Sequence, residues 1–221
     1  MSRLLNRKQK GKNMEMTSAT FDRNQRIPEA CAFGIPDPDL HMCLGQNRNP
    51  QLHWSGIPDE ARSLVLLCVD TDVPSSMDEF NKEGRTVPAG LPRVDFFHWI
   101  MVDIPPMEGS IGEGECSDGI ILGGKDNPSG PQGSRQGIND YTGFMADNPE
   151  MKGDYYGYDG PCPPWNDEIP HHYHFILYAI DLNTCPVEKR FTAQQVQAAI
   201  DGHVLAEAQL TGIYALNPDL A

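Results

Sequence analysis

A proline-rich segment leads directly into three histidines and an apolar run. It reads GPCPPWNDEIPHHYHFILYAID over residues 160–181. Pro163 and Pro164 each fix the backbone φ angle and lack an N–H group, so the segment cannot join the interior of a sheet. It is typical of a rigid wall at the mouth of a pocket. The imidazole rings that follow can bind an anion when protonated, act as a general base or ligate a metal ion.

The histidines of this stretch are predicted to divide between two faces. Along an extended chain, successive side chains point to opposite sides. His172 and His174 therefore share one face, and His171 shares the other with Tyr173. The two sets cannot contact one ligand together. Alternation alone leaves open which of the two sets faces a pocket.

Two other apolar runs carry polar residues that could complete a site. Asp70 and Asp72 directly follow the apolar run 64–69, and His98 lies inside the run 95–105. A single histidine in an apolar strand is most often a hydrogen-bonded core residue. The recurrence of polar residues at three strands changes that interpretation, and it favours a shared pocket.

Catalysis and metal binding are the alternative interpretations of these residues. An Asp–His pair suits acid–base chemistry, but Ser134 lacks the flanking glycines of a nucleophile elbow. Cys162 has no helix N-terminus to lower its pKa. His171 and His172 are adjacent in sequence, so alternation separates them as metal ligands. We therefore assign no catalytic residue, no metal ligand and no cofactor.

The composition predicts a β-rich fold. The 221 residues include 21 glycines and 19 prolines, which indicates many turns. Strands are expected at residues 63–70, 95–105 and 173–182, and a further one with a period of two begins at residue 204. One helix is expected, capped by Thr192 and ended by Gly202. Together, these expected strands and the helix predict a β-sandwich with helices attached late in the chain.

Charge and hydropathy exclude several classes of function. The chain has 17 basic and 31 acidic residues, a formal net charge of −14, which disfavours nucleic-acid binding. The longest apolar run, residues 64–69, is too short to span a membrane. The basic start lacks an apolar export signal, and six cysteines form no CxxC pair. We expect a cytoplasmic protein with reduced thiols, a disordered tail over residues 1–16 and one domain over residues 17–221.

Four motifs resemble one known family. In chain order they are DTDVPS (70–75), FHW (97–99), GSRQGINDY (133–141) and GYDGPCPP (157–164), the last followed by HHY (171–173). Together they resemble the phosphatidylethanolamine-binding protein family, most closely its bacterial and archaeal branch, often labelled Raf kinase inhibitor-like. The resemblance covers about residues 25–215.

The resemblance implies a mainly β fold, a β-sandwich with peripheral helices, and a small anion-binding pocket at one end. The residues that it assigns to ligand binding come from three motifs and are Asp70, His98, Gly160, Pro161, Cys162, Pro163, Pro164, His171 and Tyr173. Those expected at the border of the pocket are Asp72, Pro74, Trp99, Gly133 and Gly137. Two positions depart from the family pattern, because Thr71 replaces a proline and His172 replaces an arginine.

The chemistry of such a pocket suits an anion. Asp70 beside an imidazole would raise the pKa of the ring and favour its cationic form. His98 and His171 would then donate to one phosphate, sulfate or carboxylate, and Tyr173 would add an O–H donor. Backbone N–H groups of the 133–141 loop would form a nest. Because Asp70 repels an anion, we expect a compact or partly protonated one, such as a phosphate monoester.

The leading hypothesis is a binding protein for a phosphorylated or otherwise anionic ligand, presented by a small molecule, a lipid headgroup or a phosphoprotein. The resemblance implies a regulatory role of the kinase-inhibitor kind, a protein partner and a homodimer. The alternative is a hydrolase or lyase that uses an Asp–His pair in the same pocket. Phe96 is expected in the core, and the acidic stretch 147–159 on the solvated surface.

Overall fold

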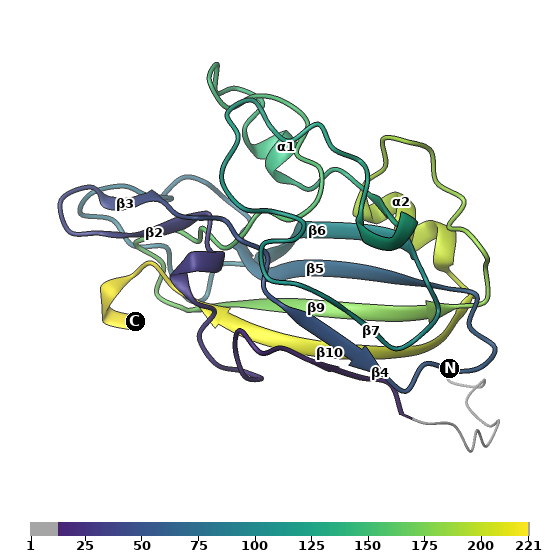
Figure 1. Cartoon of the computed structure of the whole chain (residues 1–221). Helices are drawn as coiled ribbons and strands as arrows, with labels where there is room; N and C mark the ends of the chain where they lie inside the picture. The colour runs from purple at the N-terminus through teal and green to yellow at the C-terminus, as the bar shows by residue number, and fades with distance from the viewer. Residues whose placement is uncertain (1–12, 221) are drawn as a thin grey trace.

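Three antiparallel sheets organise the chain. The computed structural model describes residues 13–220, and Figure 1 shows its elements. The largest sheet has the strand order β10 (Val204–Tyr214), β9 (His171–Ile180), β5 (Ser63–Pro74), β6 (Arg93–Ile104) and β8 (Arg135–Gln136). The second sheet contains β1 (Glu15–Thr17), β4 (Leu52–Ser55) and β7 (Gly109–Ile111), and a hairpin pairs β2 (Gly34–Asp37) with β3 (His41–Leu44).

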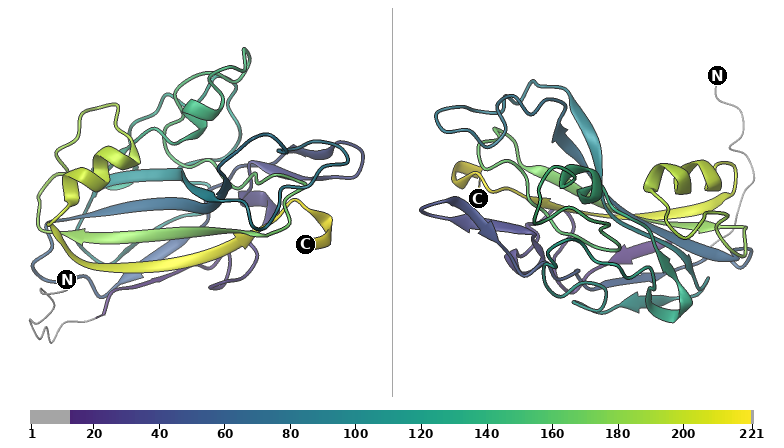
Figure 2. Two further views of the ribbon diagram at one scale, coloured as in Figure 1. Left: turned by 180° about the vertical axis from the view of Figure 1, so that it is seen from behind. Right: turned by 90° about the horizontal axis from the view of Figure 1, so that it is seen from above.

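The two larger sheets form a sandwich with an apolar core between them. Figure 2, seen from above, shows the small sheet on one side of the large one. Trp54 of β4 is buried against large-sheet residues such as Trp99 and Phe175. Every second residue of β9 is buried on this face, as the burial pattern of the strand shows. This alternation therefore determines which side chains of β9 form the interior of the sandwich.

A helix covers the opposite face of the large sheet. Helix α2 (Ala193–Ile200) packs Val196 and Ile200 against the second apolar cluster, which includes Val65 and Leu67 of β5. Its N-terminus is fixed by a capping box, in which Thr192 and Gln195 exchange hydrogen bonds. Because β5 is covered on both faces, its run of eight buried residues is apolar almost throughout.

The fold predicted from the sequence is confirmed. The four long strands and helix α2 lie where the apolar patterns place them, and the remaining helices are short: α1 (Tyr141–Phe144) and the 3₁₀ turns Glu29–Cys31, Pro131–Gly133 and Pro218–Leu220. Within residues 13–220, no helix has the length and apolar character needed to cross a membrane.

The expected boundary of the N-terminal tail needs a correction. Residues 1–12 lie outside the described part of the chain, but Glu15–Thr17 form β1 and pair with β4. Met16 is 1% exposed and belongs to the core of the sandwich. Its apolar side chain holds this segment against the sheet, so residues 15–17 belong to the folded domain.

Candidate functional site

A small cavity of about 40 Å³ lies where β5, β6 and β9 meet the proline-rich segment. The register of the sheet explains this convergence, because Asp70 of β5 pairs with Tyr173 of β9 and with Phe96 of β6. His98 lies two residues beyond Phe96 and so on the same face. The lining residues form a polar floor (Asp70, His98, His171, Tyr173), a wall (Cys162, Pro163, Pro164) and an apolar rim (Met77, Phe80, Phe96, Phe144), completed by Val73 and Tyr141.

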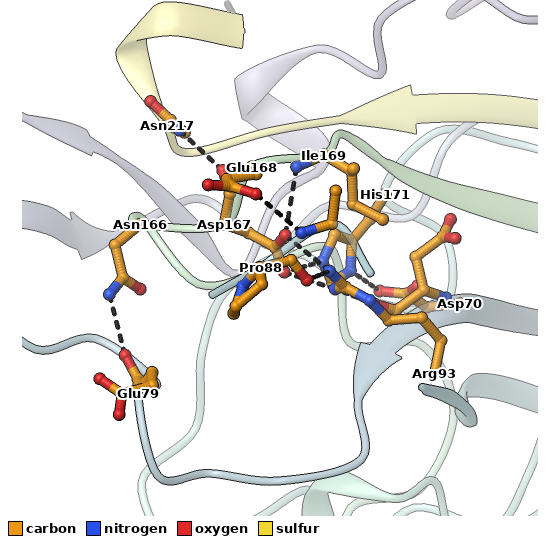
Figure 3. A network of polar contacts seen from close by, with 12 residues as sticks. Asp70, Glu79, Pro88, Arg93, Asn166, Asp167, Glu168, Ile169, His171 and Asn217 are labelled. Carbon is orange, nitrogen blue, oxygen red and sulfur yellow. Dashed lines mark hydrogen bonds and ion pairs between the residues drawn. The ribbon is translucent and has the colours of Figure 1, made fainter. Parts of the chain in front are cut away.

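His171 lies between two carboxylates. Its Nδ1 is 2.7 Å from Oδ2 of Asp70, and its Nε2 is 3.2 Å from Oδ2 of Asp167. Arg93 completes the network, with its two terminal nitrogens 2.6 and 3.0 Å from the Asp167 oxygens (Figure 3). Burial alone would lower the pKa of His171, but the two carboxylates raise it to about 9. Burial would raise the pKa of Asp70, yet His171 holds it below its usual value.

This geometry changes the role expected for His171. A cationic imidazole has two N–H donors, and here Asp70 and Asp167 accept both. The ring therefore has no donor left for a ligand in the cavity. Its positive charge instead neutralises the carboxylates, which lowers the repulsion that Asp70 would exert on an anion.

His98 keeps one ring nitrogen uncommitted. Its Nδ1 donates to the carbonyl oxygen of Asp159 at 2.8 Å. Nε2 has no hydrogen-bond partner in the described part of the chain, and the residue lines the cavity. Burial lowers the pKa of His98, and the nearby charge of Asp70 only partly offsets that effect. The ring is therefore neutral near pH 7, with its proton on Nδ1.

Tyr173 contributes a free hydroxyl group. Its oxygen is buried and makes no hydrogen bond of normal geometry among residues 13–220, although the Asp70 carboxylate lies close enough to influence it. The ring contacts His98 edge-on, with centroids 5.1 Å apart. Burial and the charge of Asp70 raise the pKa of Tyr173 well above its usual value, so the group remains an O–H donor. Tyr141 also lines the cavity, but its hydroxyl already donates to the carbonyl of Gly160 at 2.8 Å.

The wall rests on a second buried charge pair, which includes Asp159. Its carboxylate accepts hydrogen bonds from Asn47 and Asn139, each at 2.7 Å, and pairs with Lys125 at 3.1 Å. Asp159 is 1% exposed, so the expectation that the stretch 147–159 is a solvated surface is wrong at its end. This network fixes the backbone that holds the Nδ1 proton of His98.

The wall residues differ in their contact with the cavity. Cys162, Pro163 and Pro164 line it directly. Gly160 and Pro161 lie behind them, where the Pro161 carbonyl accepts hydrogen bonds from Phe33 and Gly34. Burial raises the pKa of the Cys162 thiol to about 12. That thiol is therefore a poor nucleophile.

Three residues expected at the border of the pocket, Asp72, Pro74 and Trp99, are not among the residues that line the cavity. Asp72 accepts a hydrogen bond from the backbone N–H of His172 and contacts Nδ1 of the same residue, both at 2.8 Å. Trp99 is buried in the core of the sandwich. Pro74 ends β5, and Val73 lines the cavity instead.

The glycine-containing segment also differs from the expectation. Gly137 packs against Phe191, on the helix-covered side of the sheet. The amides of residues 137–140 all donate to backbone carbonyls, among them those of Ile100 and Phe97. They are therefore not available as a nest. Gly133 faces open space and is not among the residues that line the cavity.

Several site residues were not found from the sequence. Phe96 was expected in the core but is part of the apolar rim, and Met77, Phe80 and Phe144 complete that rim. The motif around Asp70 identified neither Arg93 nor Asp167. Residue types alone gave no signal for these positions. Met77, Phe80 and Asp167 lie in irregular segments that fold back over the sheet, whereas Arg93 and Phe96 lie at the start of β6.

The arrangement does not favour hydrolysis or metal binding. Both nitrogens of His171 are occupied, and the Ser134 hydroxyl donates to the carbonyl of Pro131. Among the described residues, no three His, Cys, Asp or Glu side chains are arranged to hold a metal ion. What the cavity offers is a neutral imidazole, a free phenolic hydroxyl and an apolar rim.

The structure defines a class of protein, the mainly β sandwich with a small polar cavity at one end. Comparisons with known proteins identify the family. The family model described as phosphatidylethanolamine-binding protein matches residues 17–215. A UPF0098 protein of Methanothermobacter thermautotrophicus is 34% identical over 177 residues, covering 80% of this chain and 89% of that protein. The chain therefore belongs to the phosphatidylethanolamine-binding protein family.

Solved structures agree with this assignment. The crystal structure of CT736, a phosphatidylethanolamine-binding protein homologue from Chlamydia trachomatis, matches with a TM-score of 0.61 and 29% identity. The match covers 92% of this chain and 97% of that one. Escherichia coli YbcL shares the fold, with a TM-score of 0.66 at 24% identity and coverage of 92% and 98%.

Proposed function

We propose that this protein binds a compact anionic group, such as a phosphate, in the cavity at the end of the sandwich. The observation that carries the proposal is the buried hydroxyl of Tyr173, which has no partner within residues 13–220. A buried polar group without a hydrogen bond costs about 1–3 kcal/mol. A ligand that accepts this O–H proton removes that cost.

The size of the cavity supports a small anion. An ordered water molecule needs roughly 10–15 Å³ of cavity volume. The volume of this cavity is about 40 Å³. That room suits a group of the size of phosphate or sulfate, and the rest of a larger ligand would extend past the apolar rim. The pairing of Asp70 with His171 supports the same proposal, because it cancels the nearest negative charge.

The ligand group could come from a small molecule, a lipid headgroup or a phosphoprotein, which share the phosphate chemistry. We place the protein in the cytoplasm, where its six free cysteines (Cys31, Cys43, Cys68, Cys116, Cys162 and Cys185) stay reduced. A regulatory role of the kinase-inhibitor kind, with a protein partner and a homodimeric state, is part of the same proposal.

Titration with inorganic phosphate tests the proposal directly. We expect the ring resonances of His98 to shift saturably in NMR spectra. Tyr173→Phe removes only the hydroxyl and should weaken binding about tenfold or more, since a hydrogen bond to a charged group contributes about 1.5–3 kcal/mol. Tyr178→Phe, on the other face of β9, is the matched control and should bind like the wild type.

Two outcomes would contradict the proposal. If saturating phosphate, sulfate and acetate leave the His98 resonances unchanged, the cavity is not an anion site. Equal phosphate affinities of Tyr173→Phe and the wild type would show that the free hydroxyl is not part of the site.

A further inference from the structure

The charged groups around the cavity already neutralise one another. Three acidic and three basic side chains form two contact networks, and each acid lies within 3.2 Å of a basic group. The acids are Asp70, Asp159 and Asp167, and the bases are Arg93, Lys125 and His171. An anion that enters the cavity therefore introduces a charge that no group in these networks is free to balance.

Among the residues of the described chain that line the cavity, His98 has the one titratable nitrogen that remains uncommitted, since the unpaired Nε of Arg93 belongs to a residue outside this lining. The Nδ1 proton of His98 is held by the Asp159 carbonyl, so in the neutral ring Nε2 carries a lone pair. A lone pair repels an anion. His98 can donate to the ligand only after Nε2 gains a proton, which also supplies the missing positive charge.

We propose that the pocket takes up one proton together with its anion, and that the proton goes to Nε2 of His98. This inference rests on the proposed anion-binding function. The ion and the proton enter a buried site as a pair whose net charge is smaller than that of the ion alone, which reduces the desolvation cost. Affinity for the anion then increases as the pH falls.

The groups that face His98 are compatible with this uptake. The titratable ones come from β5, β9, α1, the wall and the segment just before it, and they are Asp70, His171, Tyr173, Tyr141, Cys162 and Asp159. Asp70 and Asp159 favour a cationic His98, whereas the charge of His171 opposes it. The tyrosines and the cysteine have raised pKa values and stay neutral. His171 is already protonated at neutral pH, so it cannot be the group that gains the proton.

Calorimetry with sulfate separates the protein's proton from one that the ligand brings. Sulfate has no proton to exchange near neutral pH, unlike phosphate. The binding enthalpy is measured in buffers of different ionisation enthalpy, and we expect an uptake of about one proton per sulfate at about pH 8. The affinity for sulfate should fall about tenfold per pH unit above the pKa of His98.

Two variants assign the proton to one residue. His98→Gln retains an amide donor but cannot be protonated, so we expect residual sulfate binding without proton uptake and with little pH dependence. His172→Gln alters a histidine whose side chain is 44% exposed and lies outside the cavity, and it should behave like the wild type. In the wild-type protein, NMR should show the His98 ring becoming cationic when sulfate is added, a readout that does not depend on the variant folding.

The possible results distinguish a failure of the proton uptake from a failure of anion binding. Sulfate binding with no proton uptake, or uptake that persists in His98→Gln, overturns the inference and leaves anion binding intact. If neither sulfate nor phosphate binds at any pH between about 5 and 8, the proposed function itself fails, and the proton uptake with it.

Discussion

Oδ2 of Asp70 and Nδ1 of His171 are 2.7 Å apart, and both side chains are almost fully buried. The contact joins the second half of β5 to the start of β9. The contact keeps His171 cationic, and both N–H groups of its ring are occupied by carboxylates of the protein, Asp70 and Asp167. Under the proposed function, the donors for a ligand would be Tyr173 and, after it gains a proton, His98.

The first prediction concerns the stability of this network. Asp167→Asn removes the carboxylate shared by Arg93 and His171, and it leaves two buried cations with one fewer partner. Breaking a buried ion pair in this way costs about 3–5 kcal/mol. We expect the free energy of unfolding in urea to fall by that amount.

An exposed pair provides the control. Asp181 contacts His203 at 2.8 Å, but their side chains are 48% and 43% exposed. Asp181→Asn should change the free energy of unfolding by less than about 1 kcal/mol. Equal losses in the two variants would show that burial adds nothing to the Asp167 contacts.

The second prediction concerns the pH dependence of stability. The pKa of His171 is raised in the folded protein from 6.5 to about 9. A raised pKa contributes stability that is complete below the unfolded value and is lost as the pH rises through the folded value. Between about pH 6.5 and 9, this group should therefore lower the free energy of unfolding by roughly 2–3 kcal/mol.

Urea unfolding at several pH values tests this sign. His171→Gln should lose this decline, so that the difference in stability between wild type and variant shrinks as the pH rises. Asp70 acts at the other end of the scale. Its lowered pKa contributes stability that disappears as the pH falls below its unfolded value of 3.8. A difference between wild type and His171→Gln that stays constant from about pH 6.5 to 9 would contradict a cationic His171.

The sequence was sufficient for the framework of the fold. The four long strands were identified because their apolar runs and alternation are strong signals, and α2 because Thr192 and Gly202 mark its ends. The strands of the small sheet were not predicted, since β1, β4 and β7 contain three or four residues each. Segments so short show no period.

Sequence patterns predicted only part of the candidate site. Strand alternation placed His171 and Tyr173 on one face. It could not show that Asp167 takes the second nitrogen of His171, because Asp167 comes from an irregular segment. The tautomer of His98 likewise depends on a single backbone carbonyl, that of Asp159. Such contacts follow from the paths of loops, which local patterns do not specify.

The third prediction concerns the glycine that lets the wall approach the chain near Cys31. A Cβ atom at Gly160 would collide with the backbone carbonyl of Cys31, which cannot move aside as a side chain could. Gly160→Ala should therefore lower the free energy of unfolding by about 1–3 kcal/mol or more. It should also weaken phosphate binding, because the wall shifts with it.

Gly90 is the matched control for that substitution. A Cβ atom there would have no neighbour within 4 Å. Gly90→Ala should leave the free energy of unfolding within about 0.5 kcal/mol of the wild type. Stability unchanged in Gly160→Ala would show that the wall segment adapts without cost.

The apolar rim gives the last prediction. Met77 and Phe144 are 48% and 46% exposed, although both are large and apolar. Phe144 lies 6.0 Å from Phe80 and 6.2 Å from Phe96, measured between ring centroids. Exposed apolar side chains beside a polar cavity are available to contact the rest of a ligand.

Phenyl phosphate should therefore bind more tightly than methyl phosphate, and Phe144→Ala should reduce this preference by about 2–10-fold, since an aromatic contact contributes about 0.5–1.5 kcal/mol. Inorganic phosphate should bind Phe144→Ala and the wild type equally, because it does not reach the rim. Leu40→Ala, a change at a side chain that is 71% exposed and not part of the cavity, is the control. Equal affinities of the wild type for the two esters would contradict a role of the rim, since the floor alone would then determine which phosphates the pocket accepts.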